Sequence, residues 1–332
     1  MEKIQIGYHA SHEQFKPSAL LELVQQAEQA GFTQVLSSDH FFPWSESQGE
    51  SGFAWSWLGA AMHATKMGYG IVNAPGQRYH PAIIAQAVAT LCEMNPGRFW
   101  IATGSGQFLN EHIDGQKWPL KQVRNERLKE SVDIMRALWR GETVSHNGHV
   151  QVSEARLYTR PEYIPSIIGA ALTEETAKWV GSWADGMITT SRQPAELRKI
   201  IDAFRLGGGE GKPVYLKIQL SYDTTFASAL SGAHDQWRNN VFSSALLSDI
   251  RSAQGFDAAG QMVKPADMLT SVRISDSTDQ HLEWLMADIN AGVSNLYLHN
   301  VNTRQSQFID VFGQKVIPYL INAGNMAAQN SW

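Results

Sequence analysis

The sequence predicts a single (βα)8 barrel, an α/β fold that spans residues 1–332, on three observations. Short apolar segments of strand type alternate along the chain with amphipathic segments of helical period. Segments 28–40 and 289–300 repeat one plan, in which a helix end and an Ala-Gly pair lead into an apolar strand, and 179–191 is a weaker copy. About eight strands and eight helices without a break in composition favour one barrel over a doubly wound sheet.

Composition and charge exclude several classes of protein. With 43% hydrophobic and 18% charged residues, the chain has ample material for a core. The net charge is −5 and no basic stripe occurs, so we expect no nucleic-acid partner. A single cysteine, Cys92, excludes an internal disulfide and suits a reducing cytosol. Residues 1–15 lack a signal-peptide core and no run of 18 apolar residues occurs, so we expect a cytoplasmic protein without membrane contact.

The elements follow in order from periodicity and from Pro and Gly punctuation. Ile4, Ile6 and Tyr8 predict the first strand, and Pro17 opens a helix that ends at Gly31. The other expected strands are 33–38, 67–73, 98–103, 166–172, 186–190, 215–222 and 295–300, and the other expected helices are 54–65, 81–94, 119–140, 174–183, 194–205, 279–291 and 304–322. Residues 223–264 show no strand pattern, which predicts an irregular insertion in a βα loop, a common place for a substrate lid.

Catalytic side chains of a (βα)8 barrel lie at the carboxyl ends of its strands. Asp39, His40 and Trp44 follow the second strand, and Glu13 lies on the first loop. A histidine titrates near neutrality and can take or give a proton, so His40 is the predicted acid or base. A hydrogen-bonded loop histidine is the plainer alternative. Asp39 either orients His40 or accepts a hydrogen bond from a ligand.

Other strand ends carry small or polar residues. Gly104-Ser105-Gly106 follow the fourth strand, where small residues let a flat ring or a phosphate approach the backbone, with a tight turn as the alternative. The remaining strand-end candidates are Tyr8-His9, Asn73, Ala170-Ala171, Thr190–Arg192 and His299-Asn300. The chain has no HExxH, no GxSxG and no GxGxxG after the first strand, so no metal site, hydrolase nucleophile or Rossmann site is predicted.

Six stretches of the chain resemble the bacterial luciferase-like flavin and deazaflavin oxidoreductases. They are IGYHASHEQFKP (6–17), SDHFFPW (38–44), SGFAWSWLGA (51–60), RYHPAIIAQAVATL (78–91), GSGQFLNE (104–111) and RLKESVDIMRALWRGE (127–142). Within that family the chain is similar to the deazaflavin-dependent glucose-6-phosphate dehydrogenases. ESGFAWSWLGAA, NAPGQRYHPA and EARLYTRP resemble a subgroup predicted to have reverted from deazaflavin to an ordinary flavin.

The resemblance implies a barrel with an isoalloxazine ring at its mouth. It implies that His40 takes the substrate hydroxyl proton, that Trp44 and Glu13 shape the site, and that Gln107 hydrogen-bonds the ring or the substrate. The cofactor-binding residues it implies are Asp39, Ile71, Val72, Asn73, Gly104, Ser105, Gly106, Asn110, Ala170 and Ala171. It also implies a bulge at 70–73, often with a non-proline cis peptide. FMN is the expected cofactor, and the deazaflavin coenzyme F420 is the alternative.

Two departures from the dehydrogenases bear on the substrate. Where they carry a Glu, the proposed acid for the reduced cofactor, this chain has Gln107, whose amide cannot give up a proton at pH 7. Arg192 lies one position from the expected phosphate-binding Lys, and the rest of that site, in 250–275, does not align. Arg192 is therefore the predicted substrate residue, but glucose 6-phosphate is not the expected substrate.

Three functions stay open on the sequence alone. The first is an oxidoreductase that moves a hydride between FMN or the deazaflavin and a small organic molecule. The second is an FMN-dependent monooxygenase that consumes oxygen and receives reduced flavin from a separate reductase. The third is a catalytically idle flavin-binding relative. The resemblance further implies a homodimer, and the Trp and Phe residues near the mouth favour a partly apolar substrate.

Overall fold

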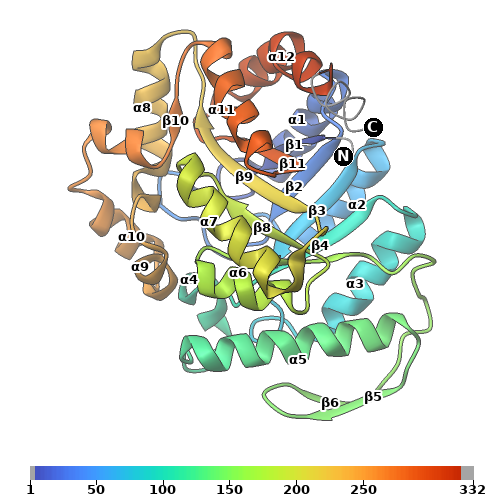
Figure 1. Ribbon diagram of the computed structural model, residues 1–332. Coiled ribbons are helices and arrows are strands. Elements are labelled where there is room, and N and C mark those ends of the chain that lie inside the picture. The colour runs from blue at the N-terminus through green and yellow to red at the C-terminus, as the bar shows by residue number, and fades with distance from the viewer. Residues whose placement is uncertain (1–3, 323–332) are drawn as a thin grey trace.

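The structure, a computed structural model, describes residues 4–322 and closes into an eight-stranded parallel barrel surrounded by helices (Figure 1). The barrel strands follow one another in the order β1-β2-β3-β4-β7-β8-β9-β11, and β11 pairs with β1 to close the ring. Every pairing in the ring is parallel. The predicted fold class is therefore confirmed.

The elements keep the labels of Figure 1. The barrel strands are β1 (Gln5–Ala10), β2 (Gln34–Ser38), β3 (Gly68–Asn73), β4 (Phe99–Thr103), β7 (Ile167–Ala170), β8 (Gly186–Thr190), β9 (Val214–Ser221) and β11 (Asn295–Asn300), and the short β10 (Arg273–Ile274) adds to the end of β9. The helices are α1 (Pro17–Gln29), α2 (Ala54–Ala64), α3 (Pro81–Met94), α4 (Phe108–Glu111), α5 (Lys121–Trp139), α6 (Glu174–Gly181), α7 (Pro194–Phe204), α8 (Phe226–Trp237), α9 (Ser244–Asp249), α10 (Ala253–Gly260), α11 (Thr278–Asn290) and α12 (Gln305–Lys315).

Two regions differ from the sequence prediction. Residues 223–264 contain no strand, as expected, but they are not irregular, because α8, α9 and α10 occupy most of them. The side chains of Thr225, Ser243 and Ser252 each accept a hydrogen bond from the first turn of one of these helices, a capping signal that hydrophobic periodicity does not register. An antiparallel hairpin of β5 (Val144–Asn147) and β6 (Gln151–Ala155), which lies outside α5 in Figure 1, was not predicted.

The bulge and cis peptide expected at 70–73 are absent. β3 pairs with β4 without a register shift from Tyr69 opposite Phe99 to Asn73 opposite Thr103, and every peptide bond in the described chain is trans. The backbone carbonyl of Asn73 accepts a hydrogen bond from the Gly104 amide, so the ladder continues to the end of the strand. This part of the expectation was wrong, because regular pairing satisfies the backbone groups that a bulge would leave open.

Alternate strand residues face two separate cores. Side chains such as Ile71, Ile101 and Leu298 pack between the strands and the helices, in the larger core. The other set fills the barrel interior, which consists of Leu36, Val72, Trp100, Ala102, Ile168, Ala170, Ile188, Tyr215 and Tyr297. A Cβ on Gly70 would overlap the indole of Trp100, so this glycine makes room for the aromatic floor of the barrel.

No helix within residues 4–322 combines the length and the apolar character that a membrane crossing requires.

Candidate active site

The centre of the candidate site is a contact between His40 and Glu13, which becomes an ion pair when the imidazole is protonated. His40 lies just after β2, and its Nδ1 contacts Oε1 of Glu13, with the two side chains 16% and 3% exposed. Oε2 of Glu13 accepts hydrogen bonds from Ser11 Oγ at 2.8 Å and Ser38 Oγ at 3.0 Å. Both carboxylate oxygens are thereby engaged, and Nε2 is the nitrogen of His40 that is available for proton exchange.

The electrostatics of this pair favour a charged Glu13. Burial alone would raise the pKa of the Glu13 carboxyl, but the charge of His40 and the hydrogen bond from it hold that pKa well below its ordinary value. An ionised Glu13 stabilises a positive charge on the imidazole. The contact with Glu13 also fixes the orientation of the ring.

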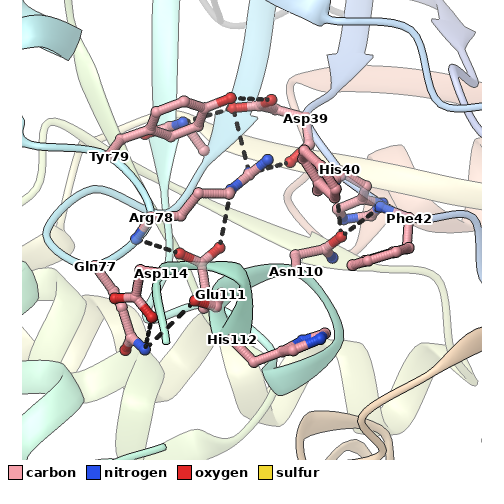
Figure 2. Close-up of polar contacts among 12 residues, drawn as sticks. Asp39, His40, Phe42, Gln77, Arg78, Tyr79, Asn110, Glu111, His112 and Asp114 are labelled. Carbon is pink, nitrogen blue, oxygen red and sulfur yellow. Dashed lines mark hydrogen bonds and ion pairs between the residues drawn. The ribbon is translucent and has the colours of Figure 1, made fainter. Parts of the chain in front are cut away.

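The backbone around His40 is held from three directions. Ser51 Oγ donates to the carbonyl of His40 at 2.8 Å, and Arg78 Nη2 donates to the carbonyl of Asp39 at 2.8 Å. The Oδ1 atom of Asn110 accepts from the amides of Phe41 and Phe42, at 2.9 and 3.1 Å (Figure 2). A loop fixed in this way presents His40 in one position, as a general acid or base requires.

The carboxylate of Asp39 accepts hydrogen bonds from side chains other than that of His40. Oδ2 accepts from Asn73 Nδ2 at 2.7 Å and from Trp55 Nε1 at 3.2 Å, while Oδ1 accepts from the hydroxyl of Tyr79 at 3.1 Å (Figure 2). Asp39 is 4% exposed. Glu13 rather than Asp39 therefore orients His40, because side chains of adjacent residues at a strand end point apart. A contact between Asp39 and the cofactor stays a prediction.

Trp44 connects the site to the segment 223–264. Its ring lies edge-on to His40, with centroids 4.9 Å apart, and edge-on to Phe256 of α10 at 5.2 Å. The carbonyl of Trp44 also accepts a hydrogen bond from Asn239 at 3.4 Å. The helices of this segment thus pack against the loop that carries His40, in the place expected of a lid.

Small side chains form the opposite wall of the mouth. Val72, Gly104 and Ala170 lie at the ends of β3, β4 and β7, and all three are partly exposed. An ideal Cβ built on Gly104 would lie 3.5 Å from the Cβ of Ala170, so the two residues are in close proximity with no side chain projecting between them. A flat ring fits such a wall, and a longer side chain would fill its place.

Some predicted cofactor residues point away from this wall. Ile71 and Ala171 are buried in the core between strands and helices, so only their backbone can meet a ring in the barrel. Oδ1 of Asn73 and Nδ2 of Asn110 are buried without a hydrogen-bond partner among the described residues. Asn73 can therefore accept a hydrogen bond from a ligand at the mouth, and Asn110 can donate one to it.

The remaining predicted residues lie around the rim. Ser105, Gly106 and Gln107 form the partly exposed loop from β4 to α4, and Gly106 has a φ of +79°, which favours glycine. Arg192 follows β8 and donates to the carbonyl of Leu172 and to Thr189 Oγ1, both at 3.2 Å. Arg192 therefore joins two rim loops, and its contact with a substrate stays a prediction.

Sequence reasoning missed a buried network behind the loop. The Arg78 amide donates to Glu111 Oε2 at 3.0 Å, and Arg78 Nε lies 3.6 Å from Oε1 of the same carboxylate (Figure 2). Burial raises the pKa of Glu111 to about 7, although the charge of Arg78 opposes the change. Both residues occur in the stretches RYHPA and FLNE that carry the family resemblance, but a sequence does not show which charged residues are buried.

Comparison with known proteins identifies the family of the chain. The family model described as luciferase-like monooxygenase matches residues 3–295. The chain is 32% identical to the F420-dependent glucose-6-phosphate dehydrogenase of Beutenbergia cavernae over 96% of this chain and 97% of that protein. It is 34% identical to the enzyme of the same name from Segniliparus rotundus, over 96% and 98%.

Solved structures extend the likeness to the whole barrel. An F420-dependent secondary alcohol dehydrogenase in complex with an F420-acetone adduct superposes with a TM-score of 0.90 at 29% identity, over 96% of this chain and 99% of that one. The coenzyme F420 dependent tetrahydromethanopterin reductase from Methanopyrus kandleri, at 19% identity and a TM-score of 0.78, shares the fold. The chain therefore belongs to the luciferase-like monooxygenase family of oxidoreductase enzymes.

Proposed function

We propose that the protein moves a hydride between a flavin-type cofactor and a small organic substrate, with His40 as the acid or base. The observation that carries the proposal is the His40–Glu13 pair, held rigidly beside a wall of small side chains. A proton-transfer group next to a bare, flat surface is the arrangement that oxidation of an alcohol by a ring cofactor needs.

The side chains of the site would have the following roles in the transfer of the hydride and the proton. A flavin-type ring, when bound, supplies the group that accepts or gives the hydride. Nε2 of His40 takes the hydroxyl proton during oxidation and returns it during reduction. The ionised Glu13 stabilises the imidazolium that forms. Trp44 covers one side of His40 and is itself backed by Phe256 of α10, which limits the access of water from that side.

Val72, Gly104 and Ala170 would hold the flat ring, with Gln107 able to hydrogen-bond its edge. We propose FMN as the ring, supported by the three stretches that resemble the reverted-flavin subgroup and by Gln107 in the place of a Glu. The deazaflavin is the alternative, and the F420-dependent relatives named above support it.

We further propose that glucose 6-phosphate is not the substrate, although relatives are named for it. A dianionic phosphate needs several free cationic groups. Arg273 of β10 is bound to the buried Asp288 through two contacts of 2.5 and 2.8 Å, and Arg192 is engaged with two rim loops. Neither guanidinium is free to complete a phosphate site without giving up these contacts.

The test is a titration of the cofactor-free full-length protein with FMN and, separately, with the deazaflavin, followed by tryptophan quenching. Binding of FMN with hydride transfer to a carbonyl compound, and without oxygen consumption beyond that of free flavin, is the expected result. Substrate-dependent oxygen consumption with reduced FMN would instead establish the monooxygenase. Tight binding of the deazaflavin alone would overturn the choice of FMN. Bound cofactor that no donor pair can reduce and reoxidise would identify an idle relative.

A further inference from the structure

Lys217 is a cationic side chain inside the barrel that the proposed mechanism does not use. It lies on β9 opposite Tyr297 of β11, and it alternates in the strand with Tyr215. Tyr215 and Tyr297 both belong to the core of the barrel interior, so Lys217 faces that interior as well. Lys217 is nevertheless partly exposed, and solvent therefore reaches it from within the barrel.

The ammonium of Lys217 has no carboxylate partner of its own. Among residues 4–322, no Asp or Glu oxygen forms an ion pair with it, and its Nζ lies 5.3 Å from the ring centroid of Trp237. Burial lowers the pKa of Lys217 to about 8, although the negative charge of Glu13 opposes the change. Both oxygens of Glu13 are already occupied. A cation inside the barrel without a paired anion is poorly compensated, so its retention points to an anion that is supplied with the ligand.

Two histidines beside Lys217 are also incompletely bonded. The rings of His9 and His299 lie 4.4 Å apart, and these residues are only 3% and 2% exposed. Both ring nitrogens of His9 and the Nδ1 of His299 lack a hydrogen-bond partner in the described chain, whereas Nε2 of His299 contacts Gln14 Oε1 at 3.0 Å. Burial, followed by the charge of Lys217, lowers the pKa of both histidines, so each is neutral and carries one N–H. His299 donates its N–H to Gln14, whereas the N–H of His9 has no acceptor among the described residues.

We propose that Lys217 and His9 together recognise the carboxylate of the substrate, and that the substrate is a small hydroxy acid or the corresponding oxo acid. The assignment rests on the proposed function and names its substrate class. One ammonium matches the single charge of a carboxylate, and the free N–H of the neutral His9 can donate to one of its oxygens. A dianionic phosphate would lack a second cation, and no group of three metal-ligating side chains exists among residues 4–322.

The position of this anion site suits the reaction. Glu13 interacts electrostatically with both Lys217 and His9 and is itself paired with His40, so the anion site and the acid–base group share one space. In oxidation of a 2-hydroxy acid, the hydroxyl proton passes to His40 and the hydride of the adjacent carbon passes to the oxidised flavin-type cofactor. The carbon–oxygen single bond becomes a carbonyl, while the carboxylate stays on Lys217 unchanged.

The test is calorimetric binding of defined probes to the full-length protein, with and without FMN. The probes are lactate and mandelate, their neutral amides lactamide and mandelamide, and phenyl phosphate as a dianion. We expect the acids to bind about 10- to 100-fold more tightly than their amides, the size of a charge-assisted hydrogen bond. Lys217→Met should abolish this advantage, whereas the exposed Lys199→Met on α7 should keep it.

Each other outcome overturns the assignment. Equal binding of acid and amide, no binding of any probe, or an acid advantage that survives Lys217→Met removes the carboxylate site. Tighter binding of phenyl phosphate would identify a phosphate site. Lys217→Gln provides a second variant if the Met variant fails to fold. A protein that binds the acids but no flavin would keep the anion site and lose the proposed function, and flavin binding without acid binding would do the reverse.

Discussion

The two halves of the barrel interior are built from different chemistry on one aromatic floor. Above Trp100, Tyr215 and Tyr297, the strands β9, β11, β1 and β2 contribute polar or ionisable side chains, which are Lys217, Gln219, His299, His9 and Ser38. The strands β3, β4, β7 and β8 contribute mostly apolar or small residues to the interior, which are Val72, Ala102, Gly104, Ile168, Ala170 and Ile188, and Thr190 of β8, opposite Lys217, is the polar exception. The difference teaches that one half is suited to moving protons and holding charge, and the other to holding a flat ring.

The two halves are joined behind the mouth by Asp39, Arg78 and Glu111. Arg78 contacts the carbonyl of Asp39, after β2, and the carboxylate of Glu111, after β4. Asn73 at the end of β3 donates to the same Asp39. The network thus fixes the polar half and the apolar half relative to each other, as transfer between two bound molecules requires.

The largest effect is expected from His40→Ala, which removes the proton-transfer group from the polar half. Turnover should fall about 10²- to 10⁴-fold, the usual contribution of a general acid or base. Flavin affinity should change little, because the ring would lie on the other half. The exposed His63→Ala on α2 is the matched control for a surface histidine. Unchanged turnover in the His40 variant would show that the proton is moved by another group.

Glu111→Gln tests the network of Asp39, Arg78 and Glu111 through the pH dependence of stability. With a folded pKa of about 7 against an ordinary 4.5, Glu111 stays protonated in the fold while it ionises in the unfolded chain. The wild type should therefore lose about 3 kcal/mol of unfolding free energy as the pH rises from 4.5 to 7. The Gln variant should lack this loss, as urea unfolding at several pH values will show. A constant gap between the two proteins would mean that Glu111 is ionised throughout.

Ala170→Leu is designed to break the apolar half alone. A leucine side chain would project over Gly104 into the space that the flat ring needs. Flavin binding should weaken about 100-fold, which corresponds to about 2.7 kcal/mol, while binding of lactate at Lys217 persists. Ala195→Leu on the exposed face of α7 is the control. Flavin affinity equal to that of the wild type would place the ring elsewhere.

Sequence patterns were sufficient to predict the barrel and the position of His40 at a strand end. They did not show which polar side chains point into the barrel or are buried beside the site. The strand-end rule placed His40 and Glu13 at the mouth, because parallel strands bring their carboxyl ends to one edge. Lys217 lies in a strand that was correctly expected, but β9 is buried on both faces, so its pattern does not show which side chains point inward. The burial of Glu111 depends on Arg78, from another loop, and no local pattern records such a contact.

Glu13→Gln should give the smallest of these effects. It keeps the size of the side chain in the polar half and removes its negative charge, so it tests the charge alone. The amide can still contact His40 and the two serines, but it carries no negative charge for the imidazolium. We expect kcat to fall about tenfold, or about 1.4 kcal/mol, with the exposed Glu22→Gln on α1 unchanged.

The same variant also tests the pH dependence of stability. Because the folded pKa of Glu13 lies well below its ordinary 4.5, its charge stabilises the fold above pH 4.5, and this contribution disappears as the pH falls through the folded value. The Gln variant should therefore be less stable than the wild type at pH 7 and converge with it in acid. Equal stability at both pH values would show that the charge of Glu13 makes no net contribution to the stability of the fold.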